Sequence, residues 1–189
     1  MSIEVRPASV FEDVAAVLGP RRPDANVCWC LSYRIPSKEN SELRGPERGE
    51  RVAELMACGP IGVLAYDGDE VVGWAAVARR AETTFARSRT IPHVDELDVR
   101  SVWCIRVRPG HRRKGISHAL LAGAVEYALA QGAPAIEGYP VDNRGEKVDT
   151  TMAYVGTRAL FEKAGFARVA ETTSVLDGFP RVVMRRALS

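Results

Sequence analysis

Hydrophobic residues recur along this chain with two spacings, and the spacing changes from one segment to the next. Alternating or continuous apolar runs bounded by turn residues predict strands, whereas apolar positions three and four residues apart predict helices. We therefore expect strands at residues 3–8, 61–66, 70–78, 99–107, 134–139, 169–176 and 181–186. We expect helices at residues 10–18, 46–56, 116–131 and 154–164.

The order of these segments predicts a mixed α/β (α+β) domain. Asp67-Gly68-Asp69 and Asp177-Gly178 are hairpin signals, so most strands should pair antiparallel. The strands at 99–107 and 134–139 are separated by a helix, which is the pattern of a parallel β-α-β crossover. Residues 1–189 should therefore form one domain with a mostly antiparallel sheet and one parallel pair.

Three segments lack a clear period. Residues 21–40 are rich in turn formers, but the apolar segment 27–33 within them predicts packing near a pocket. Residues 79–98 are polar and interrupted by Pro92, which predicts a long surface loop. The charged residues 142–151 predict a further loop.

Composition narrows the function classes. The 189 residues are 46% hydrophobic with a net charge of +2, which suits a globular protein and does not by itself imply a nucleic-acid partner. No apolar run is long enough to span a membrane, and the N-terminal residues do not resemble a signal peptide, so we expect a cytoplasmic protein. Cys28-Trp29-Cys30 has no second pair at metal spacing, so we expect reduced thiols and no metal site.

The densest chemistry lies at residues 107–117, which read V-R-P-G-H-R-R-K-G-I-S. A predicted strand precedes this run and a predicted helix follows it. The run therefore brings unpaired backbone N–H groups, the positive end of a helix dipole and several basic side chains to one point. This pattern predicts binding of a phosphorylated cofactor.

Three blocks of sequence resemble the GCN5-related N-acetyltransferase (GNAT) superfamily. The first is Arg112-Arg113-Lys114-Gly115-Ile116-Ser117, which fits the family signature of Gln or Arg, two residues, Gly, one residue, then Gly or Ala, except for its final Ser117. The second is A-L-F-E-K-A-G-F at residues 159–166. The third is Asp67-Gly68 followed by V-V-G-W at residues 71–74. The resemblance covers about residues 3–186.

The resemblance implies a twisted sheet with helices on both faces and transfer of an acetyl group from acetyl-CoA to a primary amine. It implies that the pyrophosphate lies on the turn and that the pantetheine arm pairs with the preceding strand. The residues expected to bind acetyl-CoA are Ile105, Arg106, Val107, Arg112, Arg113, Lys114, Gly115, Ile116, Ser117, Tyr154 and Phe161.

The expected catalytic residues are Glu137 as the base that takes the amine proton, or Glu96 or Asp98 in its place, and Tyr154 as the acid. Many family members have a tyrosine where this chain has Phe161, which cannot donate a proton. Tyr154 lies seven residues earlier on the same predicted helix. Tyr139 or solvent could also protonate the departing thiolate.

The acceptor would be a small-molecule or peptide amine. The residues expected to contact it are Trp29, Tyr33, Glu137 and Tyr139. Two alternatives stay open. One is an acyl-CoA-binding module without activity, suggested by Phe161, and the other is a nucleic-acid binder that uses the basic run. The second is disfavoured because no aromatic residues interleave with the basic ones. Either a monomer or a homodimer is expected.

Overall fold

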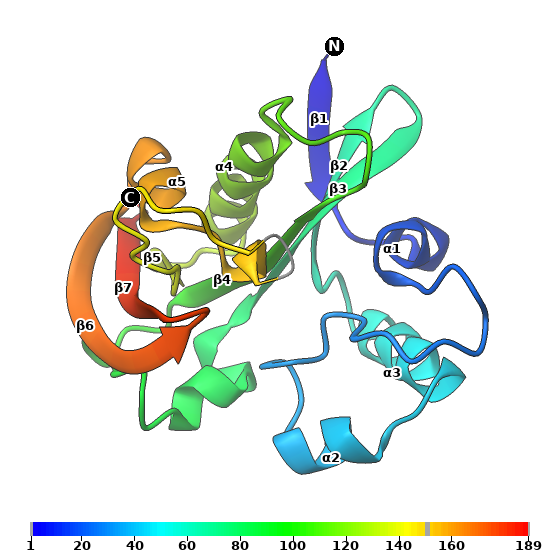
Figure 1. Ribbon diagram of the computed structural model, residues 1–189, viewed down its shortest axis with the longest axis horizontal. Coiled ribbons are helices and arrows are strands. Elements are labelled where there is room, and N and C mark those ends of the chain that lie inside the picture. Colours follow the sequence, from blue (N-terminus) through cyan, green and yellow to red (C-terminus); the bar gives the residue numbers. More distant parts are fainter. Residues whose placement is uncertain (1, 150–151, 189) are drawn as a thin grey trace.

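The computed structural model describes residues 2–149 and 152–188 and is built on one seven-stranded sheet (Figure 1). The strands are β1 Ile3–Pro7, β2 Gly62–Asp67, β3 Glu70–Arg79, β4 Arg100–Val107, β5 Ala135–Gly138, β6 Ala167–Leu176 and β7 Phe179–Ala187. Their order in the sheet is β1-β2-β3-β4-β5-β7-β6. Among these seven strands only β4 and β5 pair in parallel, which confirms the predicted topology.

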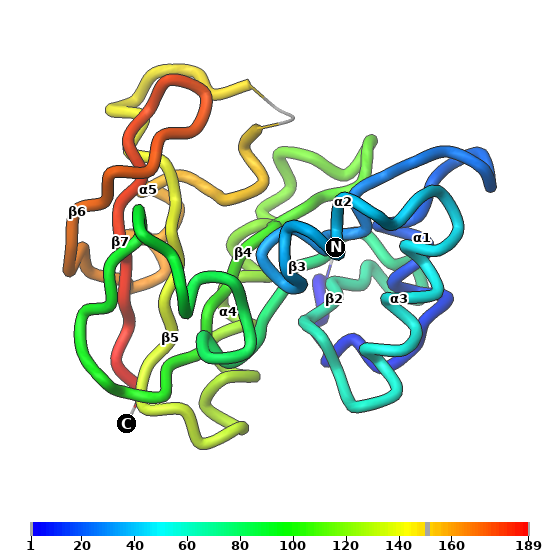
Figure 2. Tube along the Cα trace, turned by 90° about the horizontal axis from the view of Figure 1, so that it is seen from below, coloured from blue at the N-terminus to red at the C-terminus, as the bar shows by residue number. Residues whose placement is uncertain are grey.

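Helices cover both faces of the sheet (Figures 1 and 2). They are α1 Phe11–Leu18, α2 Ser37–Glu42, α3 Pro46–Met56, α4 Ile116–Ala130 and α5 Arg158–Lys163, with short 3-10 turns η1 Arg80–Glu82, η2 Thr84–Arg87 and η3 Ala153–Val155. One hydrophobic core lies under α1 and α3, and a second lies under α4 and α5. The inner strands β2 and β3 are buried at nearly every position because both faces of the sheet are covered there.

The helix predicted at residues 154–164 is instead two elements, η3 and α5. Gly156 separates them with a φ of 79°, a left-handed conformation that a helix cannot contain. The sequence suggested that Tyr154 and Phe161 share one helix face. In the structure they lie on two separate elements, η3 and α5. The short helix α2 was not expected, because its sequence S-K-E-N-S-E has no apolar face.

Residues 79–98 do not form the long surface loop that was predicted. The segment contains η1 and η2, and it buries Phe85 and Ile91 together with the charged side chain of Arg80. Residues 142–149 of the charged loop contain no helix or strand, and its last two residues, 150–151, lie outside the described residues. In the described part of the chain, none of the helices is long and apolar enough to cross a membrane.

Candidate active site

The turn between β4 and α4 presents a helix N-terminus with free amides. Gly115 caps α4 with a φ of 76°, and Arg113 in the turn has a φ of 62°. No side chain caps this end, and the first turn of α4 has no acidic residue. The first N–H groups of a helix have no partner within it, and the helix dipole adds positive potential, so this end suits a phosphate.

Basic side chains surround this helix end. Residues 112–114 are exposed, and none of them takes part in an ion pair among the described residues. Arg108 and His111 are already engaged, since their side-chain nitrogens lie 3.4 and 3.3 Å from the same carboxylate oxygen of Glu70. Arg108 and His111 thus fasten the turn to β3, while the three cations at 112–114 stay available for an anionic ligand.

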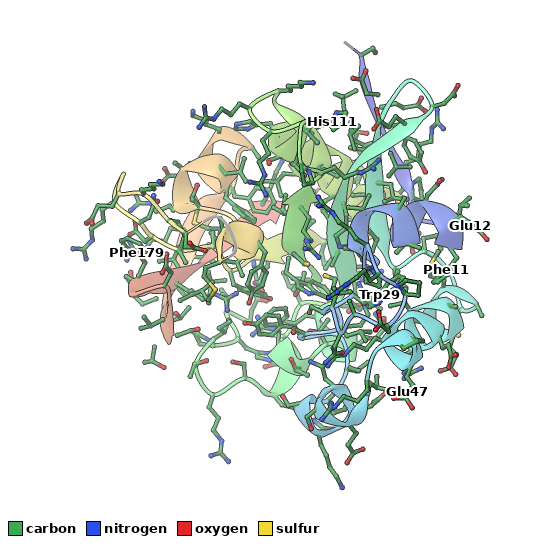
Figure 3. The ribbon with its side chains drawn as sticks, turned by 45° about the vertical axis from the view of Figure 1, so that its right-hand side comes forward. Phe11, Glu12, Trp29, Glu47, His111 and Phe179 are labelled. Carbon is green, nitrogen blue, oxygen red and sulfur yellow. The ribbon has the colours of Figure 1, made fainter. Side chains whose placement is uncertain are left out.

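A cavity of about 780 Å³ opens beside this turn, between β4 and η3. His111 marks its position in Figure 3, on the loop that leads into α4. All the predicted acetyl-CoA-binding residues except Lys114 and Phe161 line it. The full lining is Val17, Ile105, Arg106, Val107, Arg108, Pro109, His111, Arg112, Arg113, Gly115, Ile116, Ser117, His118, Ala153 and Tyr154.

The two parallel strands part beside the cavity. They pair only from Arg100 with Ile136 to Val102 with Gly138, whereas β4 continues to Val107. Along that stretch a bulge shifts the register of β4 against β3, and Cys104 within it has a φ of 53°. A strand edge without a neighbour can pair with an extended ligand through its backbone groups.

Tyr154 lies on η3 in the cavity wall, and both Tyr154 and Tyr33 pack against the same hydrophobic core. Burial raises the pKa of Tyr154 well above its ordinary value of 10, and the neighbouring phenol of Tyr33 raises it further. The positive charge of Arg181 acts in the opposite direction. The ring of Tyr33 is fixed by stacking on Phe85, with 4.5 Å between the ring centroids.

Arg181 lies behind this tyrosine pair and is only 2% exposed. Its Nη1 donates to the Tyr33 hydroxyl at 3.0 Å, and its Nε donates to the backbone carbonyl of Tyr139 at 2.7 Å. Its Nη2 is buried without a hydrogen-bond partner. Among the described residues, no carboxylate forms an ion pair with Arg181, so its charge is not neutralised locally.

Glu137, predicted as the base and as an acceptor contact, lies instead in a closed ion-pair network. Its side chain is completely buried. One oxygen accepts from Arg80 Nη1 at 2.8 Å and from the Tyr139 hydroxyl at 3.1 Å. The other accepts from Arg185 Nε at 2.9 Å and Nη2 at 2.6 Å. Glu137 does not line the cavity, so its position supports a structural role and neither predicted one.

Tyr139 and Trp29, both predicted to contact the acceptor, are core residues that do not line the cavity. Tyr139 is 1% exposed, and its hydroxyl lies 2.8 Å from that of Ser101. Trp29 stacks on Phe11, with 5.9 Å between the ring centroids, and lies between α1 and α3 (Figure 3). Tyr33, the fourth predicted acceptor contact, does not line the cavity either, but its phenol acts on the pKa of Tyr154 in the cavity wall.

Phe161, predicted to touch the cofactor, is also completely buried and does not line the cavity. Its ring packs edge-on against Phe166, with 5.0 Å between the centroids. It also fills the space above Gly138, where a Cβ would come within 2.1 Å of Phe161 Cε1. The aromatic ring therefore joins α5 to β5.

The two other candidate bases lie away from the cavity as well. Glu96 is exposed, and Asp98 pairs with Arg79 at 2.9 Å. The described residues that line the cavity include no aspartate or glutamate. A proton donor or acceptor at this site must therefore be a group other than a carboxylate.

The sequence reading missed Arg181, which is separated from Tyr33 by 148 positions. No local pattern marks it, because basic residues are common in the strand that carries it. It also missed Val17, His118 and Ala153 in the cavity wall. These residues come together only through the tertiary fold.

The parallel strands β4 and β5 separate beside a helix N-terminus that is surrounded by basic side chains. This arrangement is typical of an α/β domain that binds a phosphate group and an extended ligand. The family model described as the acetyltransferase (GNAT) family matches residues 30–166, and the chain belongs to this family. The match confirms the resemblance found in the sequence. A comparison with curated proteins found no match.

Solved structures share the fold at low sequence identity. Histone acetyltransferase HPA2 and related acetyltransferase from Corynebacterium glutamicum is 19% identical with a TM-score of 0.58, over 100% of this chain and 98% of that one. A GNAT-family acetyltransferase from Bacillus cereus is 14% identical with a TM-score of 0.58, over 100% and 99%. PaiA N-acetyltransferase from Thermoplasma acidophilum, solved in complex with coenzyme A, is 14% identical with a TM-score of 0.55, over 99% of each chain.

Proposed function

We propose that this protein transfers the acetyl group of acetyl-CoA to a primary amine of a small molecule or peptide. The observation that carries the proposal is the cavity itself, which joins a basic helix N-terminus to an open strand edge. The relative solved with coenzyme A supports it by sharing the fold. Phosphates and an extended pantetheine arm match these two halves of the cavity in charge and shape.

Each part of the cavity has a separate task in this proposal. The amides at residues 115–117 and the cations at 112–114 hold the phosphates. The backbone of residues 105–107 pairs with the pantetheine arm, and one of its N–H groups polarises the thioester carbonyl. Tyr154 lines the same cavity and gives a proton to the leaving sulfur.

The acceptor amine must be neutral when it attacks, and the described cavity residues supply no carboxylate to take its proton. We propose that the proton leaves to solvent. The same lining is neutral or cationic, which disfavours polycations such as polyamines. Amines without further positive charge, including amino acids and peptide N-termini, are therefore the better acceptors.

Calorimetry with acetyl-CoA, and with CoA that lacks the 3′-phosphate, tests the cofactor site. We expect micromolar binding that weakens without the 3′-phosphate. Gly115→Glu should abolish it, because the new carboxylate would occupy the phosphate position. Gly132→Glu is the matched control, since this glycine follows the other end of α4 with a similar φ of 68° and equally open surroundings. Normal binding to a folded Gly115→Glu variant would refute the assignment.

An acyl-CoA-binding module without activity is the second candidate. The absence of a carboxylate from the described cavity lining and the burial of Phe161 favour it. Labelled acetyl-CoA, incubated with a panel of amines that includes polyamines, separates the two functions. Acetylated product supports the transferase, whereas tight binding without product from any amine supports the module.

A further inference from the structure

His111 uses only one of its two ring nitrogens for contacts within the described part of the chain. Its Nε2 lies 3.3 Å from a carboxylate oxygen of Glu70, the first residue of β3. Its Nδ1 is buried and has no hydrogen-bond partner among the described residues. His111 nevertheless lines the cavity, on the loop that leads into α4 (Figure 3). Buried polar atoms are normally paired, so the unpaired nitrogen indicates a partner from outside the chain.

The strand β3 holds His111 in place. The backbone N–H of His111 donates to the Arg108 carbonyl at 3.1 Å, and the Arg108 N–H donates to the Val72 carbonyl at 2.9 Å. The Arg108 guanidinium donates to the Val71 carbonyl at 2.9 Å and lies 3.4 Å from the same Glu70 oxygen. The imidazole is thus positioned before a ligand binds, which lowers the entropic cost of binding one.

The contact with Glu70 decides which ring nitrogen carries the hydrogen. An ionised carboxylate only accepts, so the hydrogen of a neutral imidazole lies on Nε2, towards Glu70. Nδ1 is then a bare acceptor, which repels the oxygens of a phosphate because these also only accept. A second proton on Nδ1 turns the same nitrogen into a charged donor, which suits a phosphate.

We propose that His111 binds a phosphate group of the cofactor through Nδ1, as an imidazolium that takes up its second proton when the cofactor binds. This inference rests on the proposed binding of acetyl-CoA in the cavity. The proton comes from solvent, and no bond of the cofactor breaks. Because histidine exchanges protons between about pH 5 and 8, the affinity for the cofactor should depend on pH in this range.

The charges around His111 link protonation to the ligand. Glu70 on β3 brings one negative charge into contact with the ring. The other charged or titratable residues in or beside the described cavity wall are Arg106 from β4, Arg108 and residues 112–114 from the turn, His118 from α4 and Tyr154 from η3. The cations among them oppose a further positive charge on the ring until phosphates neutralise them. Cofactor binding and protonation therefore favour each other.

Calorimetry in buffers with different heats of ionisation counts the protons taken up on binding. The ligand is acetyl-CoA that lacks the 3′-phosphate, because a phosphate monoester itself titrates near pH 6. We expect the wild-type protein to take up about half a proton or more per ligand at pH 7. Its affinity should fall about five- to tenfold between pH 6.5 and pH 8.

The three histidines of the chain provide the variants. His111→Gln keeps an amide donor for the Glu70 side but has no second proton to gain, so the uptake and the pH dependence should disappear. His93→Gln is the control, since this exposed histidine contacts the Ala86 carbonyl and does not line the cavity. It should bind as the wild type does at every pH. Uptake that disappears in His118→Gln and persists in His111→Gln would assign the proton to His118 instead.

Nitrogen-15 NMR of the histidine side chains tests the placement of the hydrogen without any cofactor. The His111 signals are assigned by elimination with His93→Gln and His118→Gln, so the test does not depend on the folding of His111→Gln. At pH 8 we expect the neutral ring of His111 to carry its hydrogen on Nε2. At pH 7 the ligand should raise the fraction of His111 that is protonated on both nitrogens.

The outcomes separate this inference from the function on which it rests. Cofactor binding without proton uptake, or a hydrogen on Nδ1 in the protein alone, would overturn the role of His111 and leave the proposed function intact. If acetyl-CoA does not bind with or without its 3′-phosphate, the proposed function fails, and the role of His111 fails with it.

Discussion

Two sets of arginine side chains meet at Tyr139, the residue after β5, and they differ in charge balance. In the first, Arg80 and Arg185 are balanced by Glu137 and by Asp95, which lies at the rim of the network. In the second, Arg181 reaches a backbone carbonyl and a hydroxyl but no carboxylate among the described residues. Tyr139 belongs to both, since its hydroxyl bonds to the first group and its carbonyl accepts from the second.

This difference in charge balance indicates different roles, one in the stability of the fold and one in the reaction. In the balanced network every charge has its partner, so it stabilises no further charge, and removing Glu137 leaves Arg80 buried and unpaired. The unbalanced cation of Arg181 lowers the pKa of Tyr154 in the cavity wall, so it can stabilise negative charge that appears there during a reaction. The balanced network should therefore respond to substitution in stability, and the unbalanced one in rate.

The largest expected effect is on the balanced side. Glu137→Gln keeps the shape of the side chain but removes its charge, which leaves the buried Arg80 without a counter-ion and Arg185 with only Asp95 at the rim. We expect the free energy of unfolding to fall by about 3–5 kcal/mol, measured by chemical denaturation. Glu126→Gln on the exposed face of α4 is the control and should change it little. A loss of under about 1 kcal/mol in Glu137→Gln would show that the network is not essential.

On the cavity side, Tyr154→Phe should lower kcat by about 100-fold, because a general acid contributes at least that much in typical enzymes. The free energy of unfolding and the affinity for acetyl-CoA should change little, since the ring remains in the cavity wall. Steady-state kinetics with calorimetry on the same preparation checks this. An unchanged kcat would assign the proton to solvent and leave Tyr154 as a wall residue.

The phosphate half of the site could be predicted from sequence because all its parts are neighbours along the chain. A strand, a basic turn and a helix start within residues 100–117 place the amides and cations without help from other segments. The strands were predictable for a similar reason, since burial on one or both faces leaves a short-range pattern. Hairpin turns then fixed which strands pair antiparallel.

The catalytic half could not be predicted, because it depends on contacts between distant segments. The reading took Tyr154 and Phe161 for one helix, since nothing in the apolar pattern shows the positive φ of Gly156. It placed Glu137 at the cleft because a carboxylate in an apolar strand suggests function. Its two arginine partners are 57 and 48 positions away in sequence, so the sequence could not show that the charge is neutralised.

Tyr139→Phe tests the residue that both groups share, with a smaller expected effect. It removes a hydroxyl that donates to Glu137 and bonds to Ser101, but keeps the carbonyl that accepts from Arg181. We expect the free energy of unfolding to fall by about 1–2 kcal/mol, the contribution of one or two buried hydrogen bonds. The change in kcat should be far smaller than in Tyr154→Phe. A comparable loss of kcat would mean that the two groups act as one.

The smallest effect belongs to Asp95, at the exposed rim of the balanced network. A hydrogen bond from Arg185 holds the pKa of this carboxyl below its ordinary value of 3.8, so the ionised form stabilises the folded state. A lowered pKa gives stability that is present above 3.8 and is lost as the pH falls through the lower, folded value. Asp95→Asn should therefore be less stable than the wild type at neutral pH, and the difference should vanish in acid. Denaturation midpoints measured from neutral to strongly acidic pH check this, with Glu96→Gln as the neighbouring exposed control. A difference that persists in strong acid would show that the aspartate acts through its shape and not its charge.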